Sequence, residues 1–389
     1  MTAGDTHTTR RRVLKTIGVT GLAGLAGCTG DGDGTDTPDG GNGNGNGNGG
    51  MTGTSTGTGT SSGTDDETVR AAWLYISEVG DLGWSWAHDQ GRQAVDDEFD
   101  WLETDFSEAI APPDGKDEME RYTNEGYDII FGTTFEYMSD MVTMSDENPD
   151  TLYEHCSGFQ TTDNLGRYFG RMDQARYLAG MASGMVTEEN TLGYVAAFPI
   201  SEVVRGINAY TLGARSVNSE VTTKVRWTNS WYDPPGETQA AEALLDEGVD
   251  VMAQHQDTPS ALEAAAEADI WATGYDAPMG EFAGDDYLTS PIWHWEEFYR
   301  PTLESVRDGT WESDFYYGDI SEGIVDIDDW GPQVSSDVKN EVSSARTDIE
   351  NGDLNIWADS SFSDWSTSER FQNMGSYVEG VEGSVPSDN

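Results

Sequence analysis

Short apolar runs alternate with segments of helical periodicity through most of the chain beyond residue 68. Apolar runs between turn-forming residues predict strands, and apolar positions three or four residues apart predict helices. The predicted strands are residues 69–76, 127–131, 191–197, 224–228, 249–253, 270–275 and 287–292. The predicted helices are residues 87–98, 137–145, 201–218, 235–248, 259–269 and 335–352, and Ser201 is expected to cap the third of them.

This alternation predicts an α/β fold of two lobes, each built on a doubly wound parallel sheet. A strand followed by a helix and a second strand places the two strands in parallel. The pattern runs in two series, and residues 68–389 have the length of two domains. In such folds ligands bind beyond the carboxyl ends of the strands. The residues that follow each strand are therefore the candidate binding site.

Aromatic and acidic residues gather in these segments. The aromatic residues are Trp84, Trp86, Phe135, Phe198, Trp231 and Trp293, and the carboxylates are Asp233, Asp257 and Asp276. Any one of the aromatic residues is as consistent with core packing as with a binding site. Their recurrence at one end of the predicted sheets favours a site, because rings offer flat faces for stacking and carboxylates accept hydrogen bonds from ligand N–H or O–H groups.

The first 67 residues predict export and anchoring rather than a fold. Arg10 and Arg11 form a twin-arginine pattern, and the apolar run that follows, residues 17–26, is too short to span a bilayer. The run ends in LAGC, which resembles the lipobox of exported lipoproteins. We expect a signal peptide over residues 1–27, lipidation of Cys28 on the extracellular face of the cell membrane, and a flexible tether over residues 28–67.

The net charge predicts adaptation to high salt. The chain has 72 acidic and 20 basic residues, a formal net charge of −52, and its acidic residues are spread along the whole length. Such a surface repels itself at ordinary ionic strength, whereas molar salt shortens the Debye length to about 3 Å. A basic partner or calcium is the competing interpretation, but residues 68–389 contain no D-x-D-x-D-G loop. The sign of the charge disfavours nucleic acid as a partner.

Residues 68–389 carry no motif of a common enzyme class. Their histidines form neither H-x-x-x-H nor H-E-x-x-H, no G-x-S-x-G is present, and GTTF lacks the G-K-[ST] of a P-loop. His88 and Asp89 are interpreted as a structural pair. Cys156, the only cysteine after Cys28, is interpreted as a core residue without a disulfide partner. We expect no catalytic residue, metal or cofactor, and no transmembrane helix.

Several segments, in this order, resemble one family of binding proteins. They are GDLGWSWAHDQGR, GYDIIFGTTF, AAFPISEVVRGINAYTLGARSVN, WTNSWYDPPGETQAAEALLDEGVDV, QHQDTP, GYDAPM, WHWEEFY and DGTW. They make nearly all of residues 69–311 similar to the basic membrane protein family of ABC-transporter substrate-binding lipoproteins, which includes purine-nucleoside receptors. The G-W-[ST]-x-x-H-D stretch is most similar to a branch that we associate with adenine-like nucleobases.

The resemblance implies a fold and a set of ligand-binding residues. The fold is that of type I periplasmic binding proteins, in which a hinge joins two lobes that close on the ligand. Trp84 and Trp231 match the two aromatic residues that sandwich a purine. Asp276 matches the aspartate that binds the edge of the base, and Asp257 falls near the residue that contacts the sugar side.

One position departs from the nucleoside receptors of the family. Three residues after Ser290, where those receptors have a lysine, this chain has Trp293. The exchange disfavours a ribose-bearing ligand and favours a flat, uncharged base. Together with Phe135 and Phe198, Trp293 completes the expected set of ligand-binding residues.

The resemblance implies a solute-binding protein of an ABC importer, lipid-anchored on the outside of the cell. Its ligand would be an adenine-like purine nucleobase or a nucleoside, which it would deliver to a membrane permease served by an ATPase subunit. A sugar is an alternative ligand, because Trp stacking with Asp acceptors also suits pyranoses; a ligand-sensing receptor and a hydrolase are further alternatives. The expected lobes are residues 68–183 with 292–310 and residues 184–291 with 311–360, followed by a tail over residues 361–389.

Overall fold

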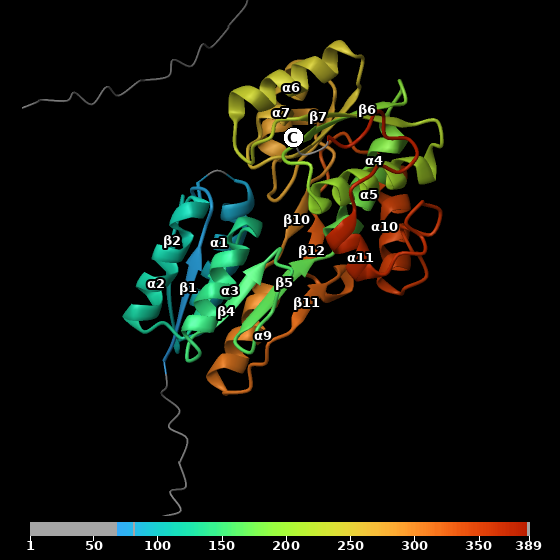
Figure 1. Ribbon diagram of the computed structural model, residues 1–389. Coiled ribbons are helices and arrows are strands. Elements are labelled where there is room, and N and C mark those ends of the chain that lie inside the picture. Colours follow the sequence, from blue (N-terminus) through green and yellow to red (C-terminus); the bar gives the residue numbers. More distant parts are fainter. Residues whose placement is uncertain (1–67, 81, 387–389) are drawn as a thin grey trace, which may run out of the picture. The chain divides into compact units, whose positions relative to one another are not determined.

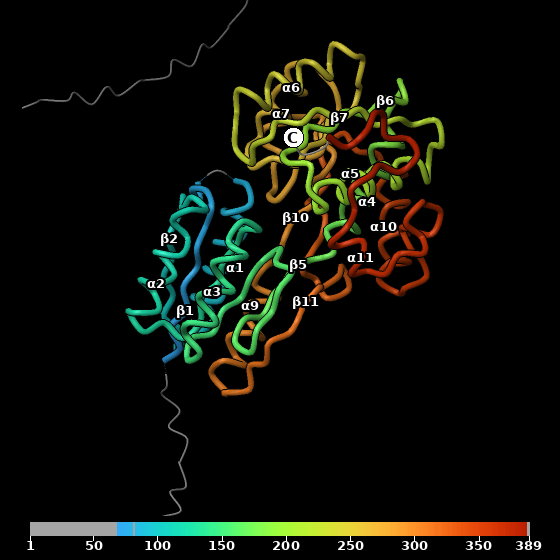
Figure 2. Tube along the Cα trace, in the orientation of Figure 1, coloured from blue at the N-terminus to red at the C-terminus, as the bar shows by residue number. Residues whose placement is uncertain are grey.

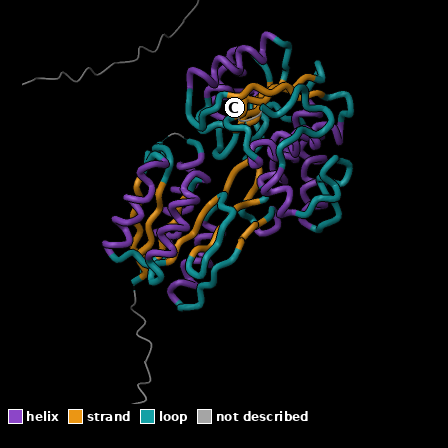
Figure 3. The backbone as a smooth tube through the Cα atoms, viewed as in Figure 1, coloured by secondary structure: helices purple, strands orange, loops and turns teal. Residues whose placement is uncertain are grey.

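The computed structural model describes residues 68–80 and 82–386 of the chain. The predicted signal peptide, Cys28 and the tether lie outside these residues. Inside them, parallel strands form two separate sheets, each accompanied by helices, as Figures 1 and 3 show. The predicted α/β class, with two doubly wound parallel sheets, is confirmed.

The first sheet has six parallel strands in the order β11-β5-β4-β3-β1-β2. These strands are β1 (Val69–Leu74), β2 (Leu102–Ser107), β3 (Ile129–Gly132), β4 (Leu152–Cys156), β5 (Leu165–Gly170) and β11 (Phe315–Gly318). The helices that pack on them are α1 (Trp84–Glu98), α2 (Gly115–Glu125), α3 (Met138–Glu147) and α9 (Glu296–Arg307). We call this sheet and its helices the first lobe.

The alternation of side chains along β1 places them in two hydrophobic cores. Ala71 and Trp73 belong to the core that includes residues of α1 and α9 and continues into the second lobe. Ala72 and Leu74 belong to a separate core with residues of α2 and α3. Successive side chains of a strand point to opposite faces of the sheet, so an uninterrupted apolar run requires cover on both faces. This explains why residues 69–76 predict a buried strand correctly.

The second sheet has four parallel strands in the order β7-β6-β8-β9. These are β6 (Thr191–Ala196), β7 (Thr222–Trp227), β8 (Val251–His255) and β9 (Trp271–Thr273). The accompanying helices are α4 (Met172–Val186), α5 (Ser201–Val217), α6 (Pro234–Asp246), α7 (Ser260–Glu267), α8 (Gly280–Ala283), α10 (Ser336–Glu350) and α11 (Thr367–Asn373). We call this sheet and its helices the second lobe.

Glycines allow α4 and α5 to approach each other closely. A Cβ atom added to Gly180 would lie 2.0 Å from the carbonyl oxygen of Tyr210, and one added to Gly213 would lie 1.9 Å from that of Tyr177. No side chain fits at either position without separating the two backbones. The resulting helix pair forms part of the core of the second lobe.

A short two-stranded ribbon accompanies the passage between the lobes. β10 (Pro291–Trp293) pairs in antiparallel orientation with β12 (Val325–Ile327), and both strands pack on α4. The predicted strand over residues 287–292 is therefore shorter than expected and lies outside the parallel sheets. From β10 the chain returns to the first lobe at α9.

Two of the expected lobe boundaries need correction. β11 falls in the range 311–360, which was assigned to the second lobe, but it pairs with β5 at the edge of the first sheet. α4 falls largely in the range 68–183, assigned to the first lobe, but it packs along α5. The chain crosses between the lobes more than once, and the local pattern of a strand or helix does not specify which sheet it joins.

The expected tail also needs correction, because residues 361–386 are packed against the second lobe. Figure 2 shows this red segment running beside α5. The Ser201 hydroxyl donates a hydrogen bond of 2.7 Å to the carbonyl of Phe371, and Val381 forms a β-bridge with Thr223. Ser201 therefore fixes the C-terminal segment and does not cap α5, whose N-cap residue is Ile200.

Candidate functional site

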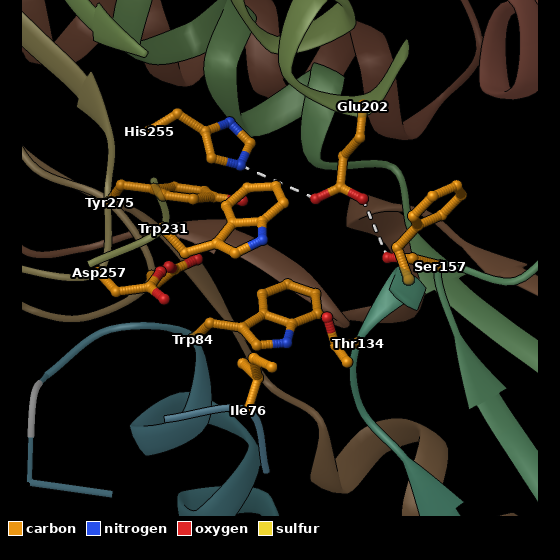
Figure 4. A pocket seen from close by; sticks show the side chains of 11 residues that line it. Ile76, Trp84, Thr134, Ser157, Glu202, Trp231, His255, Asp257 and Tyr275 are labelled. Carbon is orange, nitrogen blue, oxygen red and sulfur yellow. Dashed lines mark hydrogen bonds and ion pairs between the residues drawn. The ribbon is translucent and has the colours of Figure 1, made fainter. Parts of the chain in front are cut away.

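A cavity of about 370 Å³ lies between the loops at the carboxyl ends of the strands of both lobes. The first lobe contributes Ile76, Trp84, Thr134, Phe135 and Ser157. The second lobe contributes Glu202, Trp231, His255, Asp257, Tyr275 and Asp276. Figure 4 shows these side chains converging from both sides.

The indole rings of Trp84 and Trp231 both line this cavity, one from each lobe, as Figure 4 shows. Trp84 is the first residue of α1, and its Nε1–H donates a hydrogen bond of 2.5 Å to the carbonyl of Thr133. Its ring contacts Trp293 and Trp295 edge to face, with centroids 5.5 Å apart in both pairs. This packing fixes the ring of Trp84 and leaves it on the wall of the cavity.

Trp231 approaches from the loop between β7 and α6 in the second lobe. Its Nε1–H donates a hydrogen bond of 2.9 Å to Oε1 of Glu136, and its ring contacts Phe198 at 5.1 Å between centroids. Both indole nitrogens are thus satisfied by protein acceptors. The faces of the rings, rather than their N–H groups, are what Trp84 and Trp231 can offer a ligand.

Two aspartates lie beside these rings and are almost fully buried. Asp276 is 1% exposed, and its Oδ1 accepts a hydrogen bond of 2.8 Å from Nε1 of Trp293. Asp257 is 3% exposed, and its backbone N–H donates to the carbonyl of Trp231. Ionised carboxylates only accept hydrogen bonds, so both residues suit a ligand that presents donors.

The backbone at two site residues adopts a conformation that residues other than glycine rarely take. Ser157 and Asp276 both have a φ of 65°, in the left-handed region. Such conformations cost energy and persist where the surrounding structure enforces them, often at functional sites. Here they coincide with two side chains on the wall of the cavity.

Glu202, which is partly buried, and His255, which is buried, form a polar pair at one side of the cavity. The Ser157 hydroxyl donates a hydrogen bond of 2.9 Å to Oε2 of Glu202, while Oε1 lies 3.8 Å from Nε2 of His255. Burial raises the pKa of Glu202. Burial lowers the pKa of His255 well below its ordinary value, and the positive charges of Arg176 and Arg205 add to this effect. The imidazole is therefore neutral at physiological pH.

A second layer of side chains supports the wall of the cavity. The Arg176 guanidinium lies 3.6 Å from the centroid of the Tyr275 ring and donates a hydrogen bond of 2.6 Å to the carbonyl of Gln254. Burial raises the pKa of Tyr275 well above its ordinary value, so its hydroxyl stays protonated. Tyr275 thus presents a neutral, rigidly held surface to the cavity.

The structure places five of the seven predicted ligand-binding residues on the cavity. These are Trp84, Phe135, Trp231, Asp257 and Asp276. Phe198 lies behind Trp231. Trp293 is buried, stacks on Trp295 at 4.4 Å and holds Asp276. Neither Phe198 nor Trp293 is among the lining residues; each contacts a residue that is, Phe198 through its ring and Trp293 through its indole N–H.

Six lining residues are outside the predicted set, and they fall into three groups. Glu202, His255 and Tyr275 stand in segments that follow predicted strands, next to residues that were chosen. Their position was a usable signal, but their residue types are common in cores. Ser157 follows β4, whose sequence LYEHC mixes polar and apolar residues and predicts no strand. Ile76 and Thr134 carry no distinguishing chemistry.

The residues singled out as structural lie in packed surroundings. His88 stacks on Trp295 at 4.3 Å, and its Nδ1 lies 2.6 Å from the Tyr299 hydroxyl. Asp89 pairs with Arg92 at 2.7 Å. Cys156 is fully buried, and burial raises the pKa of its thiol.

A search of residues 68–80 and 82–386 finds no cluster of potential metal ligands. In the same part of the chain, no helix has the length and apolar character needed to cross a membrane.

Comparison with known sequences identifies a family for most of the chain. The family model described as ABC transporter substrate-binding protein PnrA-like matches residues 68–359. A protein of Haloferax volcanii, provisionally named as the glucose-binding protein of an ABC transporter, is 54% identical over 382 residues, covering 97% of this chain and 98% of the relative. A purine-binding protein of Brucella abortus is 34% identical over 333 residues, covering 82% of this chain and 95% of the relative.

Solved structures show the same fold at low sequence identity. A solute-binding protein of an ABC transporter from Conexibacter woesei has a TM-score of 0.64 at 18% identity and covers 74% of this chain and 98% of its own. A solute-binding protein from Aeropyrum pernix has a TM-score of 0.65 at 17% identity and covers 74% and 92%. With a family match from residue 68 to 359 and two relatives above 30% identity, this chain belongs to the PnrA-like family of ABC transporter substrate-binding proteins.

Proposed function

We propose that the protein captures an adenine-like purine nucleobase between its two lobes and delivers it to the permease of an ABC importer. The observation that carries this proposal is the pair of indole rings, Trp84 from the first lobe and Trp231 from the second, that line one cavity. Stacking of a base on an aromatic side chain is worth about 1–3 kcal/mol. Two such faces can hold a flat heterocycle on both sides.

The polar groups of the cavity support a ligand that donates hydrogen bonds. The lining residues include the carboxyl groups of Glu202, Asp257 and Asp276, but no Asn, Gln, Lys or Arg occurs among them. An amino-substituted purine presents N–H groups along its edge, which match carboxylate acceptors. A site that pairs such groups rejects analogues that lack them, because its buried acceptors would be left unsatisfied.

Glucose is the second candidate, because the Haloferax relative, at 54% identity, is provisionally named for it. The apolar face of a pyranose also packs on an indole ring, and its hydroxyl groups also donate to carboxylates. Many sugar hydroxyls must accept hydrogen bonds as well as donate them. The side-chain donors on the cavity wall are the hydroxyls of Thr134, Ser157 and Tyr275 and the imidazole of His255, in addition to the two indoles. The hydroxyls of Thr134 and Ser157 already donate to Glu136 and Glu202, so a sugar finds fewer donors available than an aminopurine finds acceptors.

A ligand panel separates the two candidates. Melting temperatures in molar KCl would be measured with adenine, hypoxanthine, adenosine, uracil, glucose and ribose, and hits confirmed by calorimetric titration. We expect adenine to raise the melting temperature most, since a ligand that binds only the folded state stabilises it in proportion to ln(1 + [L]/Kd). A shift with glucose and none with any purine would replace the nucleobase by a sugar. Recovery of unchanged adenine after long incubation would distinguish binding from hydrolysis.

Membrane anchoring is part of the proposal and rests on the sequence around Cys28. Two acyl chains on one residue hold a protein stably on a membrane, whereas one chain does not. In the native host, the wild-type protein should be recovered with the membranes, and a Cys28→Ala variant should not. Equal distribution of both proteins would contradict anchoring through Cys28 and leave the ligand proposal untouched.

A further inference from the structure

Glu136 reaches across the cleft to the stacking residue of the opposite lobe. It lies in the short 3-10 helix η2 (Phe135–Tyr137) of the first lobe. Its Oε1 accepts the 2.9 Å hydrogen bond from Nε1 of Trp231 in the second lobe, and its Oε2 accepts a hydrogen bond from the Thr134 hydroxyl of its own loop. The carboxylate is therefore fixed by the first lobe and directed at the second. Glu136 itself does not line the cavity.

This contact determines the orientation of the Trp231 ring only when the lobes are together. Within its own lobe, the ring of Trp231 has Phe198 as an edge-to-face neighbour. The indole N–H is a donor with a single direction, so its acceptor fixes the rotation of the ring about the side-chain bonds. Because that acceptor belongs to the first lobe, separation of the lobes removes it.

Two more contacts cross the cleft beside Trp231. The Ser157 hydroxyl of the first lobe donates to Glu202 of the second lobe at 2.9 Å. Gly83, the N-cap residue of α1, lies so close to the second lobe that an added Cβ would be 2.5 Å from the Cα of Asp257. The structure is thus a closed arrangement, and its closeness at this point depends on the absence of a side chain at position 83.

We propose that Glu136 is a positioning residue that locks Trp231 over the ligand as the lobes close. The lobes then close and the Trp231 ring takes its position in one step. Loss of the Glu136 acceptor both favours opening of the lobes and frees the ring. The role in stacking rests on the proposed function, whereas the bond between the lobes exists whatever the ligand is. Since the contact forms after a ligand has entered the open cleft, it acts on ligand dissociation more than on association.

The test compares four proteins: wild type, Glu136→Ala, Glu136→Gln and Glu263→Ala. Glu263 lies exposed on α7, away from the cavity, and provides the matched control. Stopped-flow tryptophan fluorescence would give the association and dissociation rates of adenine, and small-angle scattering the radius of gyration with and without it. We expect Glu136→Ala to dissociate about tenfold faster with little change in association, the magnitude of one charge-assisted hydrogen bond. Glu136→Gln keeps an acceptor oxygen, so its dissociation rate should lie close to that of wild type.

A double-mutant cycle distinguishes this role from general stabilisation of the loop. Trp231→Phe keeps a stacking ring but lacks the N–H. If the two side chains act through their mutual hydrogen bond, Glu136→Ala adds little to the dissociation rate of Trp231→Phe. Multiplicative effects of the two substitutions, or a Glu136→Ala protein with the dissociation rate of wild type, would overturn the proposal.

Gly83→Ala tests the closed arrangement independently. Alanine is compatible with the start of α1, but its Cβ would meet the backbone of Asp257. We expect a folded protein, by melting temperature and circular dichroism, whose radius of gyration no longer falls when adenine is added. Closure indistinguishable from wild type would overturn the proposed geometry. If wild type binds no adenine, the ligand proposal fails, and the same variants are compared by small-angle scattering without ligand. Glu136→Ala must then still have a larger radius of gyration than wild type. The two proposals can therefore fail separately.

Discussion

At the scale of single residues, the two indole N–H groups of the site donate hydrogen bonds to protein acceptors. The faces of the rings are the part that a ligand can contact. Trp84 is held by the Thr133 carbonyl, and Trp231 by Glu136 from the opposite lobe. Trp293, expected on the cavity, instead orients Asp276. Under the proposed function, the tryptophan that stands where the resemblance implies a lysine acts on the ligand indirectly, through the carboxylate of Asp276.

Removal of either stacking ring should weaken binding without unfolding the protein. Trp84→Ala and Trp231→Ala should each raise the Kd for adenine about tenfold or more, the magnitude of one stacking face. Trp101→Ala is the matched control, because Trp101 packs on Phe99 at the opposite end of the first sheet. Calorimetric titration in molar KCl gives the Kd values. Unchanged Kd values in both site variants would refute the sandwich.

Glu154 should make stability depend on pH. This carboxyl group is buried on β4, accepts a 2.9 Å hydrogen bond from Nε1 of Trp311, and burial raises its pKa to about 8. Between the unfolded pKa, near 4.5, and about 8, the folded state holds a proton that the unfolded state has released, so stability falls as pH rises through this window. Urea unfolding at pH 5, 6.5 and 8 should show that Glu154→Gln loses less stability with rising pH than wild type or Glu263→Gln. Parallel pH profiles would contradict the buried, protonated state of Glu154.

At the scale of elements, the C-terminal segment contacts both the edge strand β11 of the first sheet and helix α5 of the second lobe. The family model matches the chain up to residue 359, and α11 lies beyond that point. Phe371 of α11 contacts Phe315 and Tyr317 of β11, with centroids 5.2 Å away in both pairs. Its backbone carbonyl accepts hydrogen bonds from Ser201 and Arg205 of α5. One short helix therefore touches both lobes.

Truncation of this anchor should destabilise the whole protein. Phe371 is 3% exposed, so Phe371→Ala leaves a cavity and should cost about 3 kcal/mol or more of unfolding free energy. Asn373→Ala, at an exposed position of the same helix, is the control and should cost far less. Chemical denaturation in constant molar salt provides both values. Similar losses in the two variants would show that α11 is only loosely attached.

At the scale of the whole molecule, charge dominates the solution behaviour. With 72 acidic and 20 basic residues, most carboxylates have no basic partner available. Ion pairs exist, such as Lys116 with Glu147 at 3.0 Å, but exposed pairs contribute little. Repulsion among the remaining carboxylates opposes the compact state and is screened by salt.

Stability should therefore rise steeply with salt. We expect the melting temperature to increase from 0.1 M to about 2 M KCl, most strongly in the lower part of this range, where the Debye length changes most. Sorbitol at the same osmolality controls for exclusion of solutes from the protein surface. If sorbitol stabilises as much as KCl, screening is not the cause, and the interpretation as adaptation to high salt fails.

The α/β class, and the end of the sheets at which the candidate site lies, follow from the sequence alone. Apolar runs such as residues 69–76 indicate strands that are buried on both faces. Helical periodicity between successive runs indicates crossover helices, and strands joined in this way are parallel. Because ligands bind beyond the carboxyl ends of such strands, position placed Trp84, Trp231, Asp257 and Asp276 among nine candidates, and the family resemblance then singled out these four. These are properties of short stretches of chain, which a sequence displays directly.

Which of these residues line the cavity, and how their side chains are held, depends on contacts between distant parts of the chain. Glu136 and Trp231 are 95 residues apart, and no local pattern connects them. Whether Trp293 faces a ligand or holds Asp276, and whether β11 joins the first sheet or the second, depends on packing between distant segments. Contacts of this kind arise from the complementary shapes and charges of surfaces that exist only after the chain has folded.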